Sequence, residues 1–147
     1  MSNSSVTIDK ADRGDLNRVE ALLEANDLPH QDVRTKPSCF FVAYSDTEFV
    51  GIGGIEIYGS NGLLRSVVIT ESNRGQSYGA ALCDALEAYA RTNGVSTLYL
   101  LTTSAVAFFR QCGYGVIVRD GVPSSIQRTT EFTELCPISA TCLKKDL

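Results

Sequence analysis

Histidine and paired cysteines are scarce in this sequence of 147 residues, and their scarcity excludes several kinds of chemistry. His30 is the only histidine, and no two cysteines have CxxC spacing. No group of histidine, cysteine and acidic residues has the spacing of metal ligands, so we expect no metal site. A cysteine nucleophile is also disfavoured, because Cys136 has no neighbour in sequence that would activate its thiol.

The five cysteines are odd in number and form no pattern of disulfide partners. Such a set is typical of reduced, mostly buried thiols in a reducing compartment. We therefore expect a cytoplasmic protein with structural thiols at Cys39, Cys83, Cys112, Cys136 and Cys142.

Long apolar runs are missing too, and the polar residues 1–5 lack the core of a signal peptide. The net charge of −4 argues against nucleic acid or a membrane surface as the main partner. No repeat or linker interrupts the chain, so we expect a single domain over residues 1–147, with a homodimer left open.

The two common phosphate-binding motifs, GxGxxG and GxxxxGK followed by Ser or Thr, are absent. In their place, an apolar run ending at Ile69 leads through a polar turn into a short loop that opens a helix. Amides at a helix start lack partners and carry the positive end of the helix dipole, which suits a phosphate. Small residues let the backbone come close, and Arg74 adds a charged donor. The alternative is a glycine-containing helix start without a ligand. As a diphosphate site, the loop would comprise Arg74, Gly75, Gln76, Ser77, Tyr78, Gly79 and Ala80.

Hydrophobic periodicity predicts strands at 7–8, 39–44, 49–58, 63–69, 98–101, 114–118 and 140–143. It predicts helices at 12–26, 75–92, 105–112 and 124–135, with a loop or short helix at 28–32. Asp12 is expected to cap the first helix, and Asn93 with Gly94 to end the long one. The order of elements predicts an α/β (α+β) fold: a mixed sheet with helices on both faces.

The stretch from Arg74 to Gly79 resembles the acetyl-CoA signature (Arg or Gln)-x-x-Gly-x-(Gly or Ala) of the GNAT N-acetyltransferases. Ser77 stands at the first Gly of that pattern; serine is small and can still donate a hydrogen bond. Residues 105–114 look like the second family motif, a short helix closing on Gly113 and Tyr114. The resemblance implies a GNAT fold with a mostly antiparallel central sheet, splayed strands four and five, and acetyl-CoA as co-substrate.

Two branches of that family resemble the chain further. Leu101-Thr102-Thr103 before a Phe-Phe helix is similar to the acetyltransferase domain of N-acetylglutamate synthase. The arsenic-resistance-associated branch resembles it more closely, through residues 64–67, 122–126, 130–132 and 135–137. Many family members have a tyrosine where this chain has Phe109, and that tyrosine protonates the leaving thiolate. The role is therefore vacant here, although Tyr78 or Ser104 could supply a proton.

The resemblance also implies which backbone groups take part. The splayed strand would expose Val67, Val68 and Ile69 to the pantetheine arm, with a backbone N–H near Val68 stabilising the oxyanion. These three residues are equally consistent with a buried strand that has no further role.

Acyl transfer to an amine needs a base, because only the neutral amine attacks. Glu56 is the candidate, since it lies in an apolar strand where the family often places a catalytic glutamate. Strand alternation puts it on one face with Gly54 and Tyr58. The alternative is a salt bridge to Arg65, which could instead clamp a substrate carboxylate. His30 could edge the acceptor site or be a solvated loop residue.

The sequence thus predicts an acetyl-CoA-dependent N-acetyltransferase acting on a small, amino-acid-like amine, with a link to arsenic resistance. A non-catalytic acyl-CoA-binding module is the alternative that Phe109 favours. An acetyltransferase acting on protein N-termini or lysines is the third hypothesis.

Overall fold

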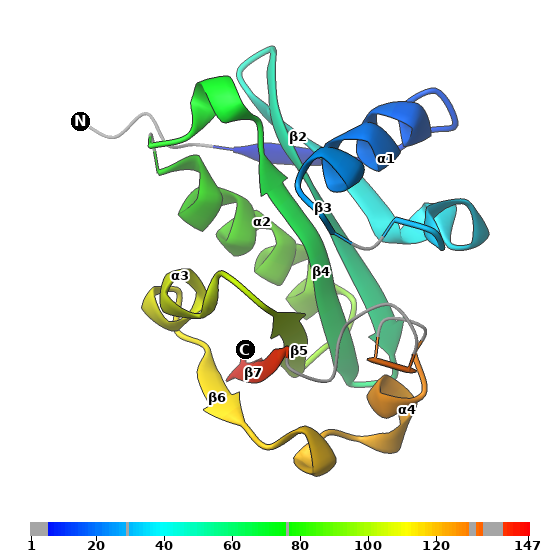
Figure 1. The fold of residues 1–147 in the computed structure, drawn as a ribbon, viewed down its shortest axis with the longest axis vertical. Helices are drawn as coiled ribbons and strands as arrows, with labels where there is room; N and C mark the ends of the chain where they lie inside the picture. The colour runs from blue at the N-terminus through cyan, green and yellow to red at the C-terminus, as the bar shows by residue number, and fades with distance from the viewer. Residues whose placement is uncertain (1–5, 29, 76, 130–131, 134–139) are drawn as a thin grey trace.

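A computed structural model gives the fold of the chain (Figure 1). It describes residues 6–28, 30–75, 77–129, 132–133 and 140–147. Within these residues, seven strands form one sheet in the order β1-β2-β3-β4-β5-β7-β6. The strands are β1 (Thr7–Lys10), β2 (Phe40–Ser45), β3 (Glu48–Tyr58), β4 (Asn61–Ile69), β5 (Thr97–Thr102), β6 (Gly115–Ile117) and β7 (Thr141–Asp146). The α-helices are α1 (Leu16–Ala25), α2 (Tyr78–Thr92), α3 (Val106–Gln111) and α4 (Ser124–Gln127). Short 3₁₀ helices are η1 (Val33–Thr35), η2 (Pro37–Cys39), η3 (Glu71–Asn73) and η4 (Arg119–Gly121).

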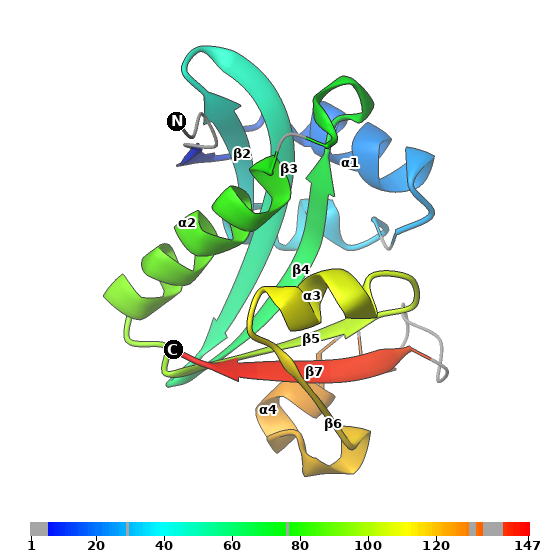
Figure 2. The ribbon, with the colours of Figure 1, turned by 90° about the vertical axis from the view of Figure 1, so that its left-hand side faces the viewer.

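Strands β4 and β5 pair only at one end. They are the parallel neighbours in an otherwise antiparallel sheet, and their pairing runs from Asn61 opposite Thr97 to Leu63 opposite Tyr99. Beyond that point β4 continues to Ile69 without β5 beside it, and Figure 2 shows the two strands diverging. The splayed, mostly antiparallel sheet expected from the sequence is therefore confirmed.

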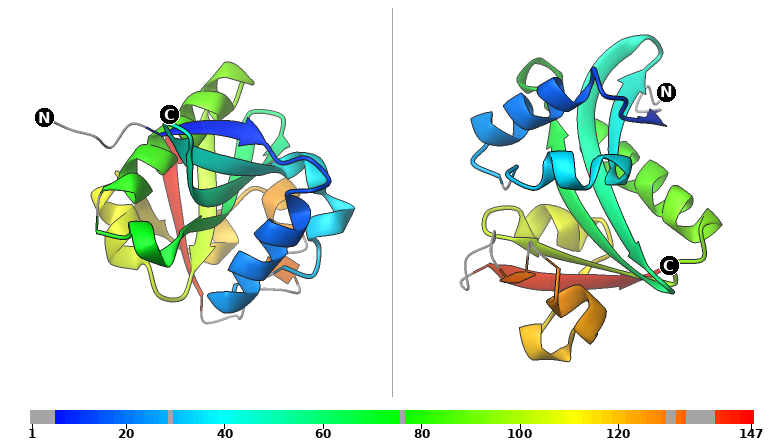
Figure 3. Two further views of the ribbon diagram at one scale, coloured as in Figure 1. Left: turned by 90° about the horizontal axis from the view of Figure 1, so that it is seen from above. Right: turned by 90° about the vertical axis from the view of Figure 1, so that its right-hand side faces the viewer.

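Helices cover both faces of the sheet, as the sequence predicts (Figure 3). On one face, α1 packs on β2, β3 and β4, and Ile126 of α4 packs on Leu63 and Tyr99. On the other face, α2 and α3 bury a cluster that includes Leu86 and Phe109. Helix α2 comes close because Gly53 has no side chain: a Cβ there would lie 2.6 Å from Cδ1 of Leu86.

Three of the predicted helix boundaries differ from the structure by more than one residue. The long helix begins at Tyr78 rather than at residue 75, because Gly75 and Ser77 have φ angles of 82° and 64°, which a right-handed helix cannot accommodate. Helix α1 begins at Leu16. Asp12 caps the turn before it: its Oδ1 accepts from the Asp15 N–H at 2.9 Å. Of the helix predicted at 124–135, α4 spans Ser124–Gln127, and part of the remainder lies outside the described residues.

The four cysteines that the structure describes are free thiols. Cys83 and Cys142 are buried, whereas Cys39 and Cys112 are half-buried. Cys136, for which packing alone was expected, lies outside the described residues.

Candidate active site

A bulge bends β4 where it leaves β5. Ile52 of β3 pairs with Val68 and Gly54 pairs with Arg65, so one residue of β3 faces two of β4. Ser66 lies in the bulge with a φ of 61°, a left-handed conformation that is uncommon for a residue other than glycine. Such strain is concentrated at functional sites, which draws attention to the surface beside it.

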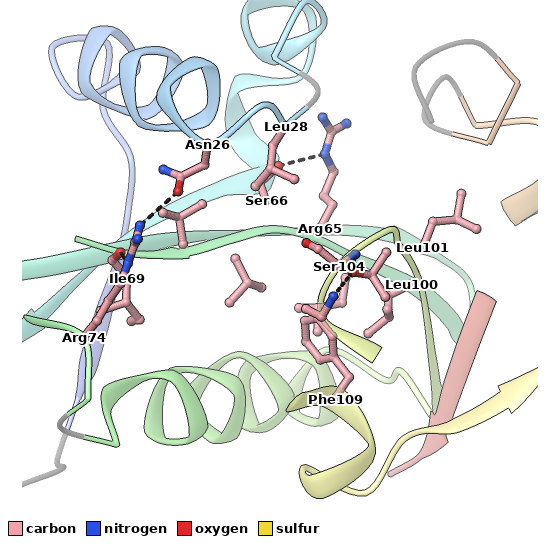
Figure 4. A pocket seen from close by; sticks show the side chains of 15 residues that line it. Asn26, Leu28, Arg65, Ser66, Ile69, Arg74, Leu100, Leu101, Ser104 and Phe109 are labelled. Carbon is pink, nitrogen blue, oxygen red and sulfur yellow. Dashed lines mark hydrogen bonds between the residues drawn. The ribbon is translucent and has the colours of Figure 1, made fainter. Parts of the chain in front are cut away.

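A cleft opens between the diverging ends of β4 and β5 (Figure 4). Its walls come from the bulged part of β4, the end of β5, helix α3 and the segment that follows α1. It brings together four of the ten cofactor residues that the sequence predicts. They are Val67, Val68, Ile69 and Arg74, with Ser104 and Phe109 on the opposite wall.

The backbone of β4 presents alternate residues to this cleft. The N–H of Thr70 donates to the carbonyl of Val50 in β3 at 2.9 Å. Because backbone groups alternate in direction along a strand, Val68 also faces β3, opposite Ile52. Ile69, between these two residues, consequently turns its backbone groups toward the open side. Val67 belongs to the bulge and lines the cleft. The backbone N–H expected near Val68 as the oxyanion donor stays a prediction.

The loop after β4 is where the sequence predicts a diphosphate site, and its described residues Arg74, Gly75 and 77–80 are called the anion cradle below. Gly75 and Ser77 are both left-handed, which explains why the signature prefers glycine at the position of Ser77. The side chain of Ser77 does not cap α2 within the described part of the chain, so the first amides of this 15-residue helix stay available to a ligand. Gly79 has a packing role, because a Cβ there would lie 3.1 Å from the ring of Phe108. Gln76 lies outside the described residues.

Arg74 already has two partners in this loop. Its Nε donates to the carbonyl of Ile69 at 3.0 Å, and its Nη2 donates to Oδ1 of Asn26 at 2.9 Å. The second contact could not be predicted from local sequence, because Asn26 lies 48 positions earlier in the chain.

Glu56 and Arg65 meet in a buried ionic network beside the bulge. The Glu56 carboxylate is 2% exposed and accepts from Nη1 of Arg65 at 3.0 Å and from Nζ of Lys36 at 3.2 Å. The hydroxyl of Tyr58 also donates to it. Asp32 accepts from both terminal nitrogens of Arg65, at 2.6 and 2.8 Å. Glu56 and Arg65 therefore form the salt bridge that was one of the two alternatives, and the role of Glu56 as a base stays a prediction.

Sequence reasoning missed Asp32 and Lys36, which flank the 3₁₀ helix η1 before β2. Burial alone would raise the pKa of Asp32, but its hydrogen bonds to Arg65 and the charges of Arg65 and Lys36 hold that pKa below its usual value. Burial and the hydrogen bond to Glu56 raise the pKa of Tyr58. The spacing of Asp32 and Lys36, at i and i+4, was the one signal in the sequence.

The stem of Arg65 reaches this network across a glycine. A Cβ at Gly54 would lie 3.2 Å from Cγ of Arg65 and 3.3 Å from the ring of Phe40. The guanidinium lies over that same ring, 5.3 Å from its centroid. Gly54 therefore leaves room for the side chain that links β4 to the segment before β2.

Phe109 lies on the wall of the cleft and is 7% exposed. Its ring meets those of Phe108 and Tyr114 edge-on, with centroids 5.0 and 5.7 Å away. The hydroxyl of Tyr114 already donates its proton in a hydrogen bond to Glu87, at 3.1 Å. His30 is half-buried and is not among the residues that line the cleft.

No group of three or more histidine, cysteine, aspartate or glutamate residues in the described part of the chain could hold a metal ion. No helix there has the length and apolar character needed to cross a membrane.

Three solved structures illustrate what the chain resembles. N-acetylglutamate synthase from Neisseria gonorrhoeae, complexed with coenzyme A and N-acetyl-glutamate, has a TM-score of 0.81 and 20% identity over 97% of this chain. This chain spans only 35% of that synthase chain. Rv2747 from Mycobacterium tuberculosis, complexed with coenzyme A, has a TM-score of 0.77 and 19% identity, covering 96% of this chain and 99% of its own. A GNAT-family acetyltransferase from Staphylococcus aureus has a TM-score of 0.73 and 16% identity, covering 97% and 99%.

Comparison with curated protein sequences gave no match. A family model, described as the acetyltransferase (GNAT) family, matches residues 10–114. That range contains the splayed strands, the bulge, the anion cradle and the helix of Phe109. Because the match covers most of the sequence, the chain belongs to the acetyltransferase (GNAT) family, whose members transfer an acetyl group from acetyl-CoA.

Proposed function

We propose that this protein transfers an acetyl group from acetyl-CoA to the amine of a small, amino-acid-like acceptor in the cleft between β4 and β5. The observation that carries the proposal is the end of pairing at Leu63 and Tyr99, beyond which the edge of β4 is open. A pantetheine arm is an extended chain with two amides, and it can hydrogen-bond to such an edge as an added strand would.

In this proposal, the backbone of Val67 and Ile69 performs the work expected of residues 67–69. Both residues line the cleft, so Ile69 would pair with the pantetheine arm and the Val67 N–H would donate to the oxyanion. A fixed backbone donor of this kind is worth roughly 3–4 kcal/mol in the transition state.

The anion cradle would hold the diphosphate. An arginine has five N–H donors. Two of those on Arg74 are engaged with Ile69 and Asn26 in the described part of the chain, so three remain for a ligand. The amides of Tyr78, Gly79 and Ala80 would add the dipole of α2.

We assign Glu56 as the final acceptor of the proton of the amine, which it would receive through an intermediate group rather than directly. Its carboxylate is buried and does not line the cleft, so the proton of the amine must reach it through water or through Tyr58 or Lys36. The competing assignment is purely structural: Glu56 balances Arg65 and leaves the amine to lose its proton to solvent. For Arg65, the two bonds to Asp32 favour an internal role over binding of an acceptor carboxylate.

Two observations support an amino-acid-like acceptor. The segment Leu101-Thr102-Thr103 resembles the amino-acid branch of the family, and the similar synthase was solved with N-acetyl-glutamate. The link to arsenic resistance rests on sequence resemblance alone. Its test is whether expression of the parent protein, and not of an Arg74→Ala variant, protects cells against arsenite.

The experiment that tests the transferase function is thiol release from acetyl-CoA across a panel of amino acids, small amines and short peptides. We expect one class of small amine to be acetylated and Arg74→Ala to weaken CoA binding by roughly 1.5–3 kcal/mol, because a charge-assisted contact is lost. Arg91→Ala, at the far end of α2, is the matched control. Binding of CoA without transfer to any amine would favour a non-catalytic acyl-CoA-binding module. Acetylation of peptides alone would favour an acetyltransferase acting on protein N-termini or lysines. No CoA binding at all would overturn the proposal.

A further inference from the structure

Asn26 ends helix α1 and faces the anion cradle. Its Nδ2 donates to the carbonyl of Leu22 one turn earlier, at 2.8 Å, which fixes the orientation of the amide. Its Oδ1 then accepts from Nη2 of Arg74 at 2.9 Å. Figure 4 shows the two side chains meeting at one end of the cleft, which both of them line.

The contact decides where the guanidinium of Arg74 lies. Nε is held by the carbonyl of Ile69 and Nη2 by Asn26, and two anchors fix the plane of a rigid guanidinium. An arginine side chain loses rotamer entropy when it is immobilised. When Asn26 and Ile69 already hold the side chain in the free protein, less entropy is lost on binding the ligand. The affinity for the ligand is then higher.

We propose that Asn26 is a positioning residue for the diphosphate of the cofactor, acting through Arg74. This inference rests on the proposed assignment of the diphosphate to Arg74 and the start of α2. An amide suits the position better than a carboxylate would, because its oxygen can hold Arg74 without placing a second negative charge beside the diphosphate.

The chain offers a matched control for the capping part of this role. Asn93 ends α2 as Asn26 ends α1, and its Nδ2 donates to the carbonyl of Tyr89 at the same 2.8 Å. No arginine contact with Asn93 is found among the described residues. Asn93→Ala therefore removes the helix-ending bond alone, whereas Asn26→Ala removes that bond together with the anchor of Arg74.

The experiment is titration of CoA into the parent, Asn26→Ala, Arg74→Ala, the double variant and Asn93→Ala, with each ligand-free melting temperature recorded. We expect Asn26→Ala to weaken CoA binding about tenfold, the effect of a single hydrogen bond to a charged group. We expect Asn93→Ala to bind like the parent. In the Arg74→Ala background, Asn26→Ala should have no further effect, because Asn26 acts through Arg74.

The possible failures are distinguishable. If Arg74→Ala binds CoA like the parent, the diphosphate assignment itself fails. If Arg74→Ala weakens binding while Asn26→Ala does not, only the role of Asn26 fails. Equal losses in Asn26→Ala and Asn93→Ala, or full additivity in the double variant, would reduce Asn26 to a helix-ending residue.

Discussion

Arg65 binds Asp32 through two hydrogen bonds, Nη1 to Oδ2 at 2.6 Å and Nη2 to Oδ1 at 2.8 Å, across 33 positions of the chain. The same side chain donates from Nε to the hydroxyl of Ser66 at 3.1 Å. One buried arginine therefore joins the segment before β2 to the bulge of β4. Since Ser66 and Val67 of the bulge line the cleft, this ion pair helps to hold one of the cleft's walls.

The first prediction concerns acid stability. Because the pKa of Asp32 is lowered in the folded state, the pair stabilises the fold above the unfolded value of about 3.9. That contribution is lost as the pH falls through the folded-state pKa. Asp32→Asn removes the charge, so at neutral pH it should cost about 3 kcal/mol or more, the usual effect of breaking a buried pair.

Urea unfolding of the parent and of Asp32→Asn, from pH 7 to pH 3, measures this contribution. We expect the difference between the two free energies of unfolding to shrink below pH 4. Asp9→Asn, an exposed change on β1, should follow the parent. A difference that stays constant down to pH 3 would contradict the assigned shift.

The second prediction separates the two roles of Glu56. As a base, Glu56→Gln should keep CoA affinity and stability while lowering turnover by about a hundredfold or more. If Glu56 is instead a charge partner, Glu56→Gln and Arg65→Met should each lose roughly 3–5 kcal/mol of stability. Either change leaves a buried charge without its partner. Unfolding curves and turnover of both variants, beside the exposed Glu48→Gln, are the measurement. Full turnover in a stable Glu56→Gln variant would reject the base assignment.

Sequence reasoning reached the parts of the site that depend on local patterns. The cofactor loop follows from the residues of one strand, one turn and one helix start, so its place could be predicted. The mixed sheet follows from the alternation of elements, although the bulge at Ser66 left no sign in the sequence. Its cause is the pairing of β4 with β3, which is not visible in either strand alone.

The ionic network is the part that local patterns could not give. Asp32 and Lys36 precede β2, Glu56 is on β3 and Arg65 is on β4, so only the folded chain brings them together. The pairing of Glu56 with Arg65 was one of the alternatives, because the two residues lie on adjacent strands. Asp32 supplied the stronger contact and was not foreseen.

The third prediction concerns Ser77, which holds a left-handed conformation at the start of α2. The left-handed conformation destabilises the folded state by roughly 1–2 kcal/mol for a non-glycine residue. Glycine avoids this strain, but its greater entropy in the unfolded chain lowers stability by roughly 0.4–1 kcal/mol. Ser77→Gly should therefore be as stable as the parent or slightly more so, with CoA affinity retained. Ser77→Val should lose stability and affinity, because a β-branched side chain is strained at positive φ.

Denaturant unfolding and CoA titration of the Gly and Val variants check this. Ser72→Val, in the 3₁₀ helix η3, is the control for the added bulk on a right-handed backbone. If Ser77→Val matched the parent in both measurements, the strain assigned to this position would be absent.

The fourth prediction concerns Phe109, where many relatives carry a tyrosine. Its ring lines the cleft and packs edge-on against Phe108 and Tyr114, so it fills volume that a tyrosine ring would also fill. A thiol titrates at about pH 8.5, so CoA is a fair leaving group near neutral pH without a dedicated acid. Phe109→Tyr should therefore release thiol within a few-fold of the parent rate.

Phe109→Ala tests the packing role of the same ring. Removing a buried phenylalanine typically costs roughly 3–5 kcal/mol, so this variant should lose activity together with stability. Thiol release with a working acceptor, measured for the parent and both variants beside their melting temperatures, separates the two effects. A hundredfold gain in Phe109→Tyr would mean that the missing hydroxyl limits the parent. In that case the chain as it stands would be a poor catalyst, and the acyl-CoA-binding module would become the better account of it.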